Sequence, residues 1–352
     1  MSRISLADKV LPRNFNNELE LILNQHNQKV HSPNKIIPRD CSHKTRIERR
    51  NNLRHCFADL YELGYRLATP TSLKQKHVQA LASHWKSKKL SAKTIQGLFS
   101  NLREFSRWIN KPGLVMDIDT YYDNDQSHLV RKTVAQNDLS WEGKGIDLSV
   151  IFAEAKELDP RFEVLLRLMR NFGLRVKEAI ELRPAVATAL DDEHLLVSHG
   201  TKGGKQRIVK IRNEQQRQTL VEAKKLLAPK NNMRLRWPDK TWKQAQAHFY
   251  HLMRRLSATR KSLRISAHGL RHAFLQDEYK IYAGVPAPIK GDNSLPKDRQ
   301  VYQRAMLAVS LQAGHYRPSI TTGYCGSFGH KLRQIDNPES KASDRNHDND
   351  KE

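Results

Sequence analysis

Cationic side chains in the second half of the 352-residue chain stand where they could bind phosphate groups. Arg175 begins a predicted helix after a Gly-Leu pair, and Glu178 follows it by one helical turn. Lys202 precedes two glycines that favour a hairpin turn, from which a long side chain can reach into a cleft. Between Lys202 and Arg236, eleven Lys or Arg residues face only two acidic ones. We expect phosphate contacts in this stretch first.

Imidazole side chains and a tyrosine follow further along the chain. His268 and Arg271 are three residues apart, which places them on one face of a helix. His315 precedes Pro318, which with the next serine is typical of a helix start, and Tyr324 lies nine residues beyond His315. Each element alone is common by chance, and a single buried tyrosine is more often a core residue than a nucleophile. Their order and spacing together are much more specific.

The sequence lacks the signatures of enzymes that use ATP or a metal ion. Lys205 follows two glycines but has neither the upstream glycine nor the Ser/Thr of a nucleotide-binding P-loop. H-E-x-x-H and EF-hand patterns are absent. Three adjacent acids at 191–193 favour a solvated turn over a magnesium site, because neighbouring side chains in a turn point apart. We therefore expect no cofactor and no metal.

Composition favours a polyanionic partner. Lys and Arg number 61 against 37 Asp and Glu, so the formal net charge is +24. Nucleic acid is the usual partner of such a charge, with a solubility role or an anionic membrane surface as the alternatives. Three cysteines far apart in sequence indicate no disulfide scaffold or zinc ribbon. Without a signal-peptide or transmembrane pattern, we expect a cytoplasmic, nucleoid-associated protein that avoids membranes.

The first 147 residues divide into three parts. Residues 1–44 are polar and form an extension of unknown role, with one short helix near Leu19 to Leu23. Residues 45–120 have apolar residues at helical spacing and predict a compact helical domain. Its aromatic stripes are expected to be core, and its lysine-rich faces could contact DNA phosphates. Residues 121–147 lose periodicity and predict an interdomain linker.

Residues 148–330 predict a second, larger domain. Asp159 and Pro160 begin a helix that Gly173 ends, and two short apolar runs around 195–198 and 207–211 predict a β-hairpin. Further helices are expected near Leu220 and Phe249, and residues 283–298 predict a loop. The tail 331–352 is polar and expected to be disordered. The expected fold class is mainly α with a small β-hairpin.

The order of these motifs resembles the tyrosine recombinase (phage integrase) family over about residues 45–330. Glycine, leucine, Arg175 and Glu178 match the family's G-L-R-x-x-E context, and His268 with Arg271 matches its H-x-x-R. A hairpin pattern selects Lys202 rather than Lys205. The family's G-H motif matches Gly314 and His315, and its nucleophile matches Tyr324. The resemblance thus implies six catalytic residues: Arg175, Lys202, His268, Arg271, His315 and Tyr324. It also implies a helical core-binding domain joined to a mixed α/β catalytic domain.

The resemblance implies DNA cleavage by Tyr324 through a 3′-phosphotyrosyl intermediate. Arg175 and Arg271 would hold the non-bridging phosphate oxygens with forked donors, and His315 would donate another hydrogen bond. His268 is the better candidate for general base, and Lys202 can supply a proton to the leaving 5′-oxygen. The covalent bond conserves the cleavage energy, so rejoining needs no ATP.

Integration or excision of a mobile element is the implied role, with double-stranded DNA as the substrate. A homotetramer on paired DNA sites and accessory DNA-bending proteins are the implied partners. The alternatives are a topoisomerase of the same chemistry, a catalytically silent DNA-binding protein of the same fold, and a basic chromatin protein. One departure from compact family members is an apparent insertion near residues 280–305. The polar segment after Tyr324 also departs from an apolar C-terminal helix donated to a neighbouring subunit.

Overall fold

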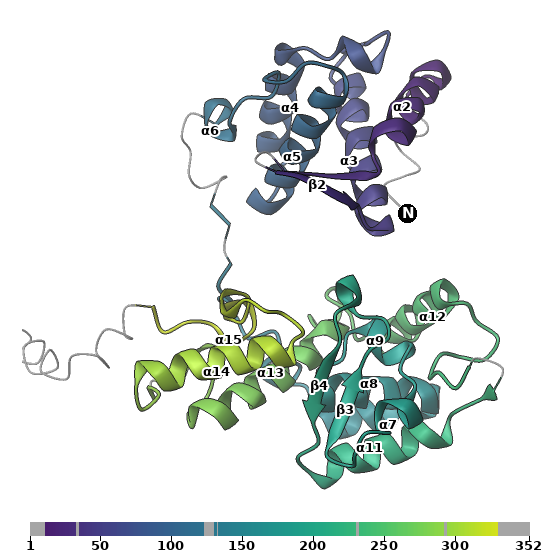
Figure 1. The fold of residues 1–352 in the computed structure, drawn as a ribbon, viewed down its shortest axis with the longest axis vertical. Helices are drawn as coiled ribbons and strands as arrows, with labels where there is room; N and C mark the ends of the chain where they lie inside the picture. The colour runs from purple at the N-terminus through teal and green to yellow at the C-terminus, as the bar shows by residue number, and fades with distance from the viewer. Residues whose placement is uncertain are drawn as a thin grey trace, which may run out of the picture. The chain divides into compact units, whose positions relative to one another are not determined.

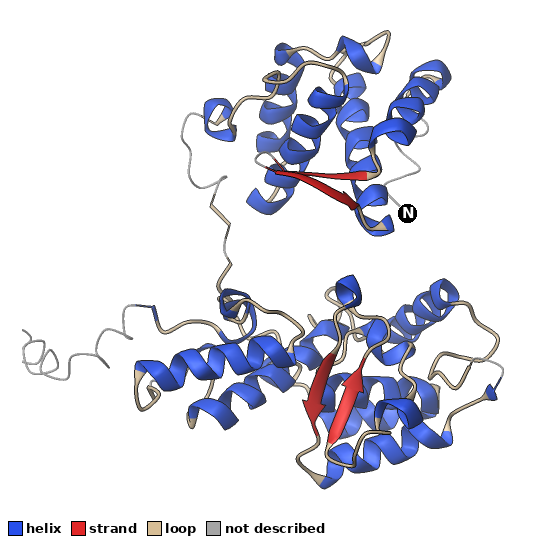
Figure 2. Ribbon diagram, viewed as in Figure 1, coloured by secondary structure: helices blue, strands red, loops and turns tan. Residues whose placement is uncertain are grey.

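The computed structural model describes residues 11–32, 35–122, 130–131, 133–229, 232–291 and 294–329, with only the backbone for 29–32 and 35–39 (Figure 1). The chain divides into two units, Met1–Lys132 and Thr133–Glu352. Helices dominate both units, and each contains one two-stranded antiparallel hairpin (Figure 2). The expected mainly α fold class is confirmed, and the hairpin of the first unit is an addition to it. The expectation of a disordered tail at 331–352 lies outside the described residues.

The N-terminal unit is a set of helices around an aromatic core. Its elements are α2 (Arg13–His26), β1 (Lys29–Ser32), β2 (Lys35–Asp40), α3 (His43–Glu62), η1 (Pro70–Ser72), α4 (Gln75–Ser87), α5 (Ala92–Trp108) and α6 (Ile118–Tyr121). The side chain of Ser91 caps α5 by accepting a hydrogen bond from the backbone of Thr94, as expected for an N-cap. Phe57 of α3 and Phe105 of α5 meet edge to face at 5.3 Å between ring centroids. The aromatic stripes are therefore core.

Helix α2 belongs to this same core. Phe15, Leu19 and Leu23 are buried along one face, and the Phe15 ring lies 5.1 Å from that of Phe57. Residues 11–27 thus fold with the helical unit, although the sequence suggested an extension that ends at residue 44. The apolar spacing of α2 predicted the helix, but only the packing reveals which surface covers it.

The C-terminal unit contains the second hairpin within a larger set of helices. Its elements are η3 (Glu142–Lys144), α7 (Leu148–Leu158), α8 (Pro160–Phe172), α9 (Val176–Ile180), α10 (Pro184–Ala187), β3 (His194–Val197), η4 (Lys202–Gly204), β4 (Arg207–Lys210), α11 (Glu214–Lys225), α12 (Trp242–Arg255), α13 (Ala267–Ala283), η6 (Pro288–Lys290), α14 (Arg299–Gln312), η7 (Pro318–Ile320) and α15 (Thr322–Cys325). Helix α8 lies at the centre and contacts α7, α11 and α13.

Local sequence signals explain the ends of α8. Asp159 caps it by accepting a hydrogen bond from the backbone of Phe162 at 2.8 Å, and Pro160 occupies its first position. Gly173 ends it in the left-handed conformation, with φ +59°. A side chain at Gly173 would also collide with the ring of Phe274 on α13. This glycine therefore both ends α8 and allows α13 to lie close to the turn that leads to Arg175.

The hairpin pairs Leu195 with Val209 and Val197 with Arg207. Side chains alternate across it, so Leu195 and Val209 are buried in the core while Ile208 is half exposed. The expected hairpin is confirmed. Lys202 lies in the connection between its strands.

The end of the expected linker is part of the C-terminal unit. Trp141 is fully buried, and its indole N–H donates to the carbonyl of Ser266 at 2.7 Å. A side chain at Gly269 would collide with the Leu139 carbonyl and with Trp141. Residues 133–147 therefore pack against α13, although their irregular pattern predicted a linker over 121–147. Loss of periodicity identifies a segment without long helices, but it cannot separate a free linker from a packed irregular chain.

Two further sequence expectations bear on the described residues. None of the helices in these ranges combines the length and the apolar character needed to cross a bilayer. Cys41, Cys56 and Cys325 are all buried, and within the described residues no disulfide joins them.

Candidate active site

Arg175 lies at the start of α9, immediately after the α8–α9 turn. Its backbone N–H donates to Glu178 Oε2 at 2.8 Å, and its Nη1 donates to Glu178 Oε1 at 2.5 Å. Its Nη2 donates to the Ala313 carbonyl at 2.9 Å and lies 3.3 Å from His315 Nε2. The arginine is thus fixed by its own helix and by the turn after α14. Its side chain keeps 21% exposure, so the guanidinium still reaches the surface.

Arg271 projects from α13 and is fully buried. Its Nη1 donates to the Gly173 carbonyl, and its Nη2 donates to the Ala313 carbonyl at 2.5 Å. The Ala313 carbonyl therefore accepts from both Arg175 and Arg271, which holds the two guanidiniums side by side. Burial, followed by the charge of Arg175, lowers the pKa of Arg271 to about 10, so it stays protonated at neutral pH.

Glu178 is the buried carboxylate of this cluster. Arg207 donates to both its oxygens, at 3.0 and 2.7 Å, and Arg271 Nη1 lies 3.9 Å from Oε2. Burial alone would raise its pKa, but the hydrogen bonds and charge of Arg207, with the charges of Arg175 and Arg271, lower it to about 2. One carboxylate thus faces three guanidiniums, and the cluster keeps a net positive charge.

Tyr324 lies beside the imidazoles. Its ring centroid is 5.7 Å from that of His268, 4.8 Å from His272 and 6.4 Å from His315. The guanidinium carbon of Arg271 lies 5.9 Å from the centre of the tyrosine ring. The structure therefore brings together five of the six predicted site residues, from α9, α13, α15 and the turn after α14.

The imidazoles of this site are neutral at physiological pH. Burial, then the charges of His272, Arg271, Arg175 and His315, lowers the pKa of His268 to about 3. Burial followed by nearby cations lowers the pKa of His315 to about 4, and burial does the same for His272. A neutral imidazole has a nitrogen free to accept a proton.

Lys202 is the sixth predicted residue. It lies exposed at the hairpin connection, in η4, next to two glycines with φ of +71° and +73°. After burial and the charges of Arg175 and Arg271, the charge of Lys202 contributes to the lowered pKa of His315.

Arg207 is a site residue that the sequence analysis did not single out. It lies on β4 at the pairing position of Val197, its side chain is 4% exposed, and it holds Glu178. A side chain at Gly314 would lie 3.3 Å from Arg207 Cδ and 3.8 Å from Arg175 Nη1. The signal was available: 207, 209 and 211 alternate inward along the strand, and a charged residue in the inward register needs a buried partner.

The basic stretch from Lys202 to Arg236 is less available for phosphate than its charge indicates. Four of its arginines form ion pairs with carboxylates inside the unit: Arg207 with Glu178, Arg212 with Glu278, and Arg234 and Arg236 with Glu181. Charge density in sequence therefore overstates the surface that can contact DNA, because buried acids far away in sequence neutralise part of it.

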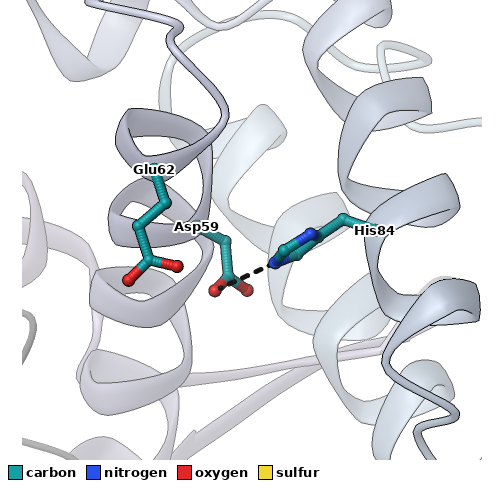
Figure 3. Close-up of side chains that lie close together, drawn as sticks. All are labelled: Asp59, Glu62 and His84. Carbon is teal, nitrogen blue, oxygen red and sulfur yellow. Dashed lines mark ion pairs between the residues drawn. The ribbon is translucent and has the colours of Figure 1, made fainter.

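A separate cluster in the N-terminal unit could hold a cation by distance alone. The ligand atoms of Asp59 and Glu62 on α3 and His84 on α4 lie within 4.8 Å of one another (Figure 3). Lys88, however, lies 3.3 Å from Asp59 Oδ1 and 3.9 Å from Glu62 Oε2, and Trp85 Nε1 donates to Asp59 Oδ2 at 3.0 Å. Lys88 and Trp85 already occupy the carboxylate oxygens of Asp59, and the cluster ties α3 to α4.

Family models match both units. The model described as Integrase matches residues 140–277, and the model described as Phage integrase, N-terminal matches residues 35–114. Arg175, Lys202, His268 and Arg271 fall inside the first range, while His315 and Tyr324 follow it. No curated protein matches the sequence.

Solved structures share the fold at low sequence identity. The integrase of the Tn1549 transposon in complex with transposon right end DNA is 14% identical, with a TM-score of 0.54 over 91% of this chain and 98% of that one. A lambda integrase dimer bound to a COC′ core site is 14% identical, with a TM-score of 0.53 over 83% and 92%. With both units matched by family models and the motifs gathered at one site, the chain belongs to the tyrosine recombinase (phage integrase) family.

Proposed function

We propose that the chain is a site-specific DNA recombinase that cleaves and rejoins DNA through a 3′-phosphotyrosyl intermediate, in the integration or excision of a mobile element. The observation that carries the proposal is the position of Tyr324, with three imidazoles and Arg271 around its ring. A tyrosine held only for packing has no need of three imidazoles and a guanidinium around its ring.

Charge balance supports phosphate as the ligand of the site. Three guanidiniums share one carboxylate, so a phosphodiester would bring the negative charge that the cluster lacks. Arg175 and Arg271 would place forked donors on its non-bridging oxygens, and His315 lies within 3.3 Å of Arg175 to add another. Donors fixed before the substrate arrives stabilise the extra charge of the transition state without reorganisation.

The proposed chemical step balances without a cofactor. The Tyr324 oxygen attacks phosphorus and passes its proton to His268, while the bond from phosphorus to the 5′-oxygen breaks. Lys202 gives a proton to that leaving oxygen. Rejoining is the reverse, with the 5′-hydroxyl as nucleophile and tyrosine as leaving group. The negative phosphate also offsets the cations that lower the pKa of His268, and so makes this imidazole a stronger base.

The proposed assembly follows from the same chemistry. Exchange between two duplexes requires four strand cuts, and each chain offers one such tyrosine. Four copies on paired DNA sites would supply the four tyrosines. DNA-bending proteins would be accessory partners. The N-terminal helical unit would add phosphate contacts through exposed lysines such as Lys74, Lys76 and Lys86.

A covalent adduct with DNA tests the proposal. DNA flanking the protein's own gene is placed on a supercoiled plasmid, incubated with protein without ATP and stopped with SDS. Wild-type protein should form an adduct. Tyr324→Phe should form none, a loss of at least about 10³-fold, and should bind DNA as tightly as wild type.

Tyr316→Phe is the matched control, because Tyr316 is a tyrosine of the same unit that is 56% exposed. It should form adducts like wild type. An adduct that survives in Tyr324→Phe would contradict the assignment of the nucleophile. Salt-sensitive DNA binding with neither adduct nor plasmid relaxation would instead support a silent DNA-binding protein.

A further inference from the structure

The helix that carries Tyr324 is too short to be stable without contacts to neighbouring segments. Helix α15 has four residues, and a single isolated turn is unstable in water. Its restraint must come from neighbouring segments. Thr321 Oγ1 donates to the Met306 carbonyl of α14 at 3.0 Å, and the backbone N–H of Ala135 donates to the Thr322 carbonyl at 3.0 Å. The second contact comes from the segment that begins the C-terminal unit.

Gln276 on α13 makes a third contact, directly at the nucleophile. Its side chain is almost fully buried, at 2% exposure. Its Nε2 donates to the backbone carbonyl of Tyr324 at 3.1 Å and to Asp138 Oδ1 at 2.9 Å. The amide group has two N–H bonds, and these two acceptors use both. Gln276 therefore links Tyr324 to Asp138.

Asp138 is held from several sides. Lys290 Nζ donates to its Oδ2 at 2.8 Å, and the backbone N–H of Ser140 donates to its Oδ1 at 2.9 Å. Burial acts to raise its pKa, but these hydrogen bonds lower it to about 2, so it is charged at neutral pH. A side chain at Gly143 would come within 2.2 Å of Asp138 Oδ2. The carboxylate thus sits in a cradle that only glycine leaves open.

Lys290 belongs to the segment of the apparent insertion near 280–305. It lies in η6, and the residue before it, Ile289, packs against Gly326 just after α15. A side chain at Gly326 would lie 3.0 Å from the Ile289 backbone nitrogen. This segment therefore contacts the nucleophile helix directly and also holds Asp138. Two irregular segments, 133–140 and 284–291, meet at one carboxylate beside α15.

We propose that Asp138 and Gln276 are positioning residues for Tyr324, and that through them the first residues of the C-terminal unit, 133–138, control where the nucleophile stands. The inference rests on the proposed function, since it concerns the position of the same tyrosine. Neither residue touches the reacting atoms. Residues 133–138 are the first of the C-terminal unit. A displacement of this segment would move Asp138, and Gln276 would transmit the movement to the Tyr324 carbonyl.

Hydrogen–deuterium exchange of the full chain tests the positioning without any DNA site. The variants are Asp138→Asn, Gln276→Leu and Lys290→Met. Each should speed exchange of the Tyr324, Cys325 and Gly326 amides by about tenfold or more, because these amides bond only within the single turn of α15. Exchange in α8 should be unchanged. Asp277→Asn is the matched control, since this carboxylate pairs with Arg170 elsewhere on the unit.

Single-turnover adduct formation tests the consequence for chemistry. The adduct rate should fall by about tenfold or more in Asp138→Asn, while the affinity for the same DNA stays at the wild-type value. Lys290→Arg should form the adduct at the wild-type rate, whereas Lys290→Met should form it more slowly. The double variant Asp138→Asn with Gln276→Leu should be no slower than Gln276→Leu alone, because both act along one path.

The outcomes separate this inference from the proposed function. No adduct from wild-type protein defeats the proposed function, while exchange at α15 still decides the positioning. Wild-type exchange at Tyr324 to Gly326 in Asp138→Asn and Gln276→Leu overturns the inference. Faster exchange with an unchanged adduct rate also overturns it, because the contacts would then be structural only. If Asp138→Asn unfolds the unit, Lys290→Met decides, since Lys290 is 35% exposed.

Discussion

The two units each contain a cluster of charged side chains, and the two clusters balance their charge differently. In the N-terminal unit, Asp59 and Glu62 face Lys88 and His84, and the side chains of Glu62 and Lys88 are 47% and 45% exposed. In the C-terminal unit, Glu178 is fully buried and faces three guanidiniums: Arg175, Arg207 and Arg271. In the first cluster Lys88 offsets part of the carboxylate charge, and the Glu62–Lys88 pair is open to solvent. The second is buried and positive.

The contrast shows how to separate a structural cluster from a site. Ion pairs that are open to solvent contribute little to stability. Buried like charges cost free energy that packing does not return, so their persistence indicates an anion that binds there. By that criterion we interpret the cluster of Asp59, Glu62 and His84 as an ion-pair network, and we propose the arginine cluster as the phosphate-binding site.

The largest effect is expected on removing the buried carboxylate. Glu178→Gln should lower the free energy of unfolding by about 3–5 kcal/mol, because it leaves three guanidiniums without a counter-charge. Chemical denaturation at pH 7 measures the loss. Glu62→Gln, in the solvent-exposed pair with Lys88, should change it by at most about 0.5 kcal/mol. Similar losses in both variants would show that the two clusters do not differ.

A lysine should not replace the guanidinium of Arg271 in adduct formation. Arg271→Lys should slow adduct formation by about 10²–10³-fold, because an ammonium cannot hold two oxygens in one plane. Quenched-flow sampling with SDS follows the rate. Arg254→Lys, at an exposed position near the end of α12, should leave it unchanged. A rate for Arg271→Lys within about threefold of wild type would count against a bidentate role.

The same burial should make stability depend on acid pH. Three histidines have pKa values lowered to about 3 or 4: His268, His272 and His315. Below pH 6.5 these imidazoles therefore bind protons in the unfolded chain but stay neutral in the folded one. Stability is therefore full above pH 6.5 and falls as the pH drops toward 4, by up to about 1.4 kcal/mol per pH unit for each imidazole. Tm measured from pH 7 to 4.5 should fall less steeply in His272→Gln. An equal slope would contradict the buried neutral state.

The smallest effect is expected in the N-terminal cluster. Lys88→Met should cost less than about 1 kcal/mol, because the ion pairs it breaks are partly exposed. Adduct formation should not change. Zinc chloride should leave the Tm of wild-type protein where it was. A clear rise in Tm with zinc that Asp59→Asn abolishes would show that this cluster binds metal. The distinction drawn between the two charged clusters would then be wrong.

Much of the fold could be predicted because its signals are local. Asp159, Pro160 and Gly173 mark the two ends of α8 through capping and backbone geometry, which depend only on adjacent residues. The aromatic stripes of α3, α4 and α5 predicted core because a helix repeats every 3.6 residues. Helix α14 was missed, since it lies in the stretch that looked like an insertion. The packed segment 133–147 was also missed, because irregular chain has no period.

The sequence by itself determined the chemical types, their order and the helices and turns on which Arg175, His268, Arg271, His315 and Tyr324 lie, because motif spacing and capping are properties of neighbouring residues. Only the tertiary structure decided that Glu178 is shared by three arginines, that Arg207 faces inward, and that Asp138 reaches Tyr324 through Gln276. These contacts join residues up to 138 positions apart. A buried charge takes its partner from whatever the folded core places beside it, and no local pattern records that choice.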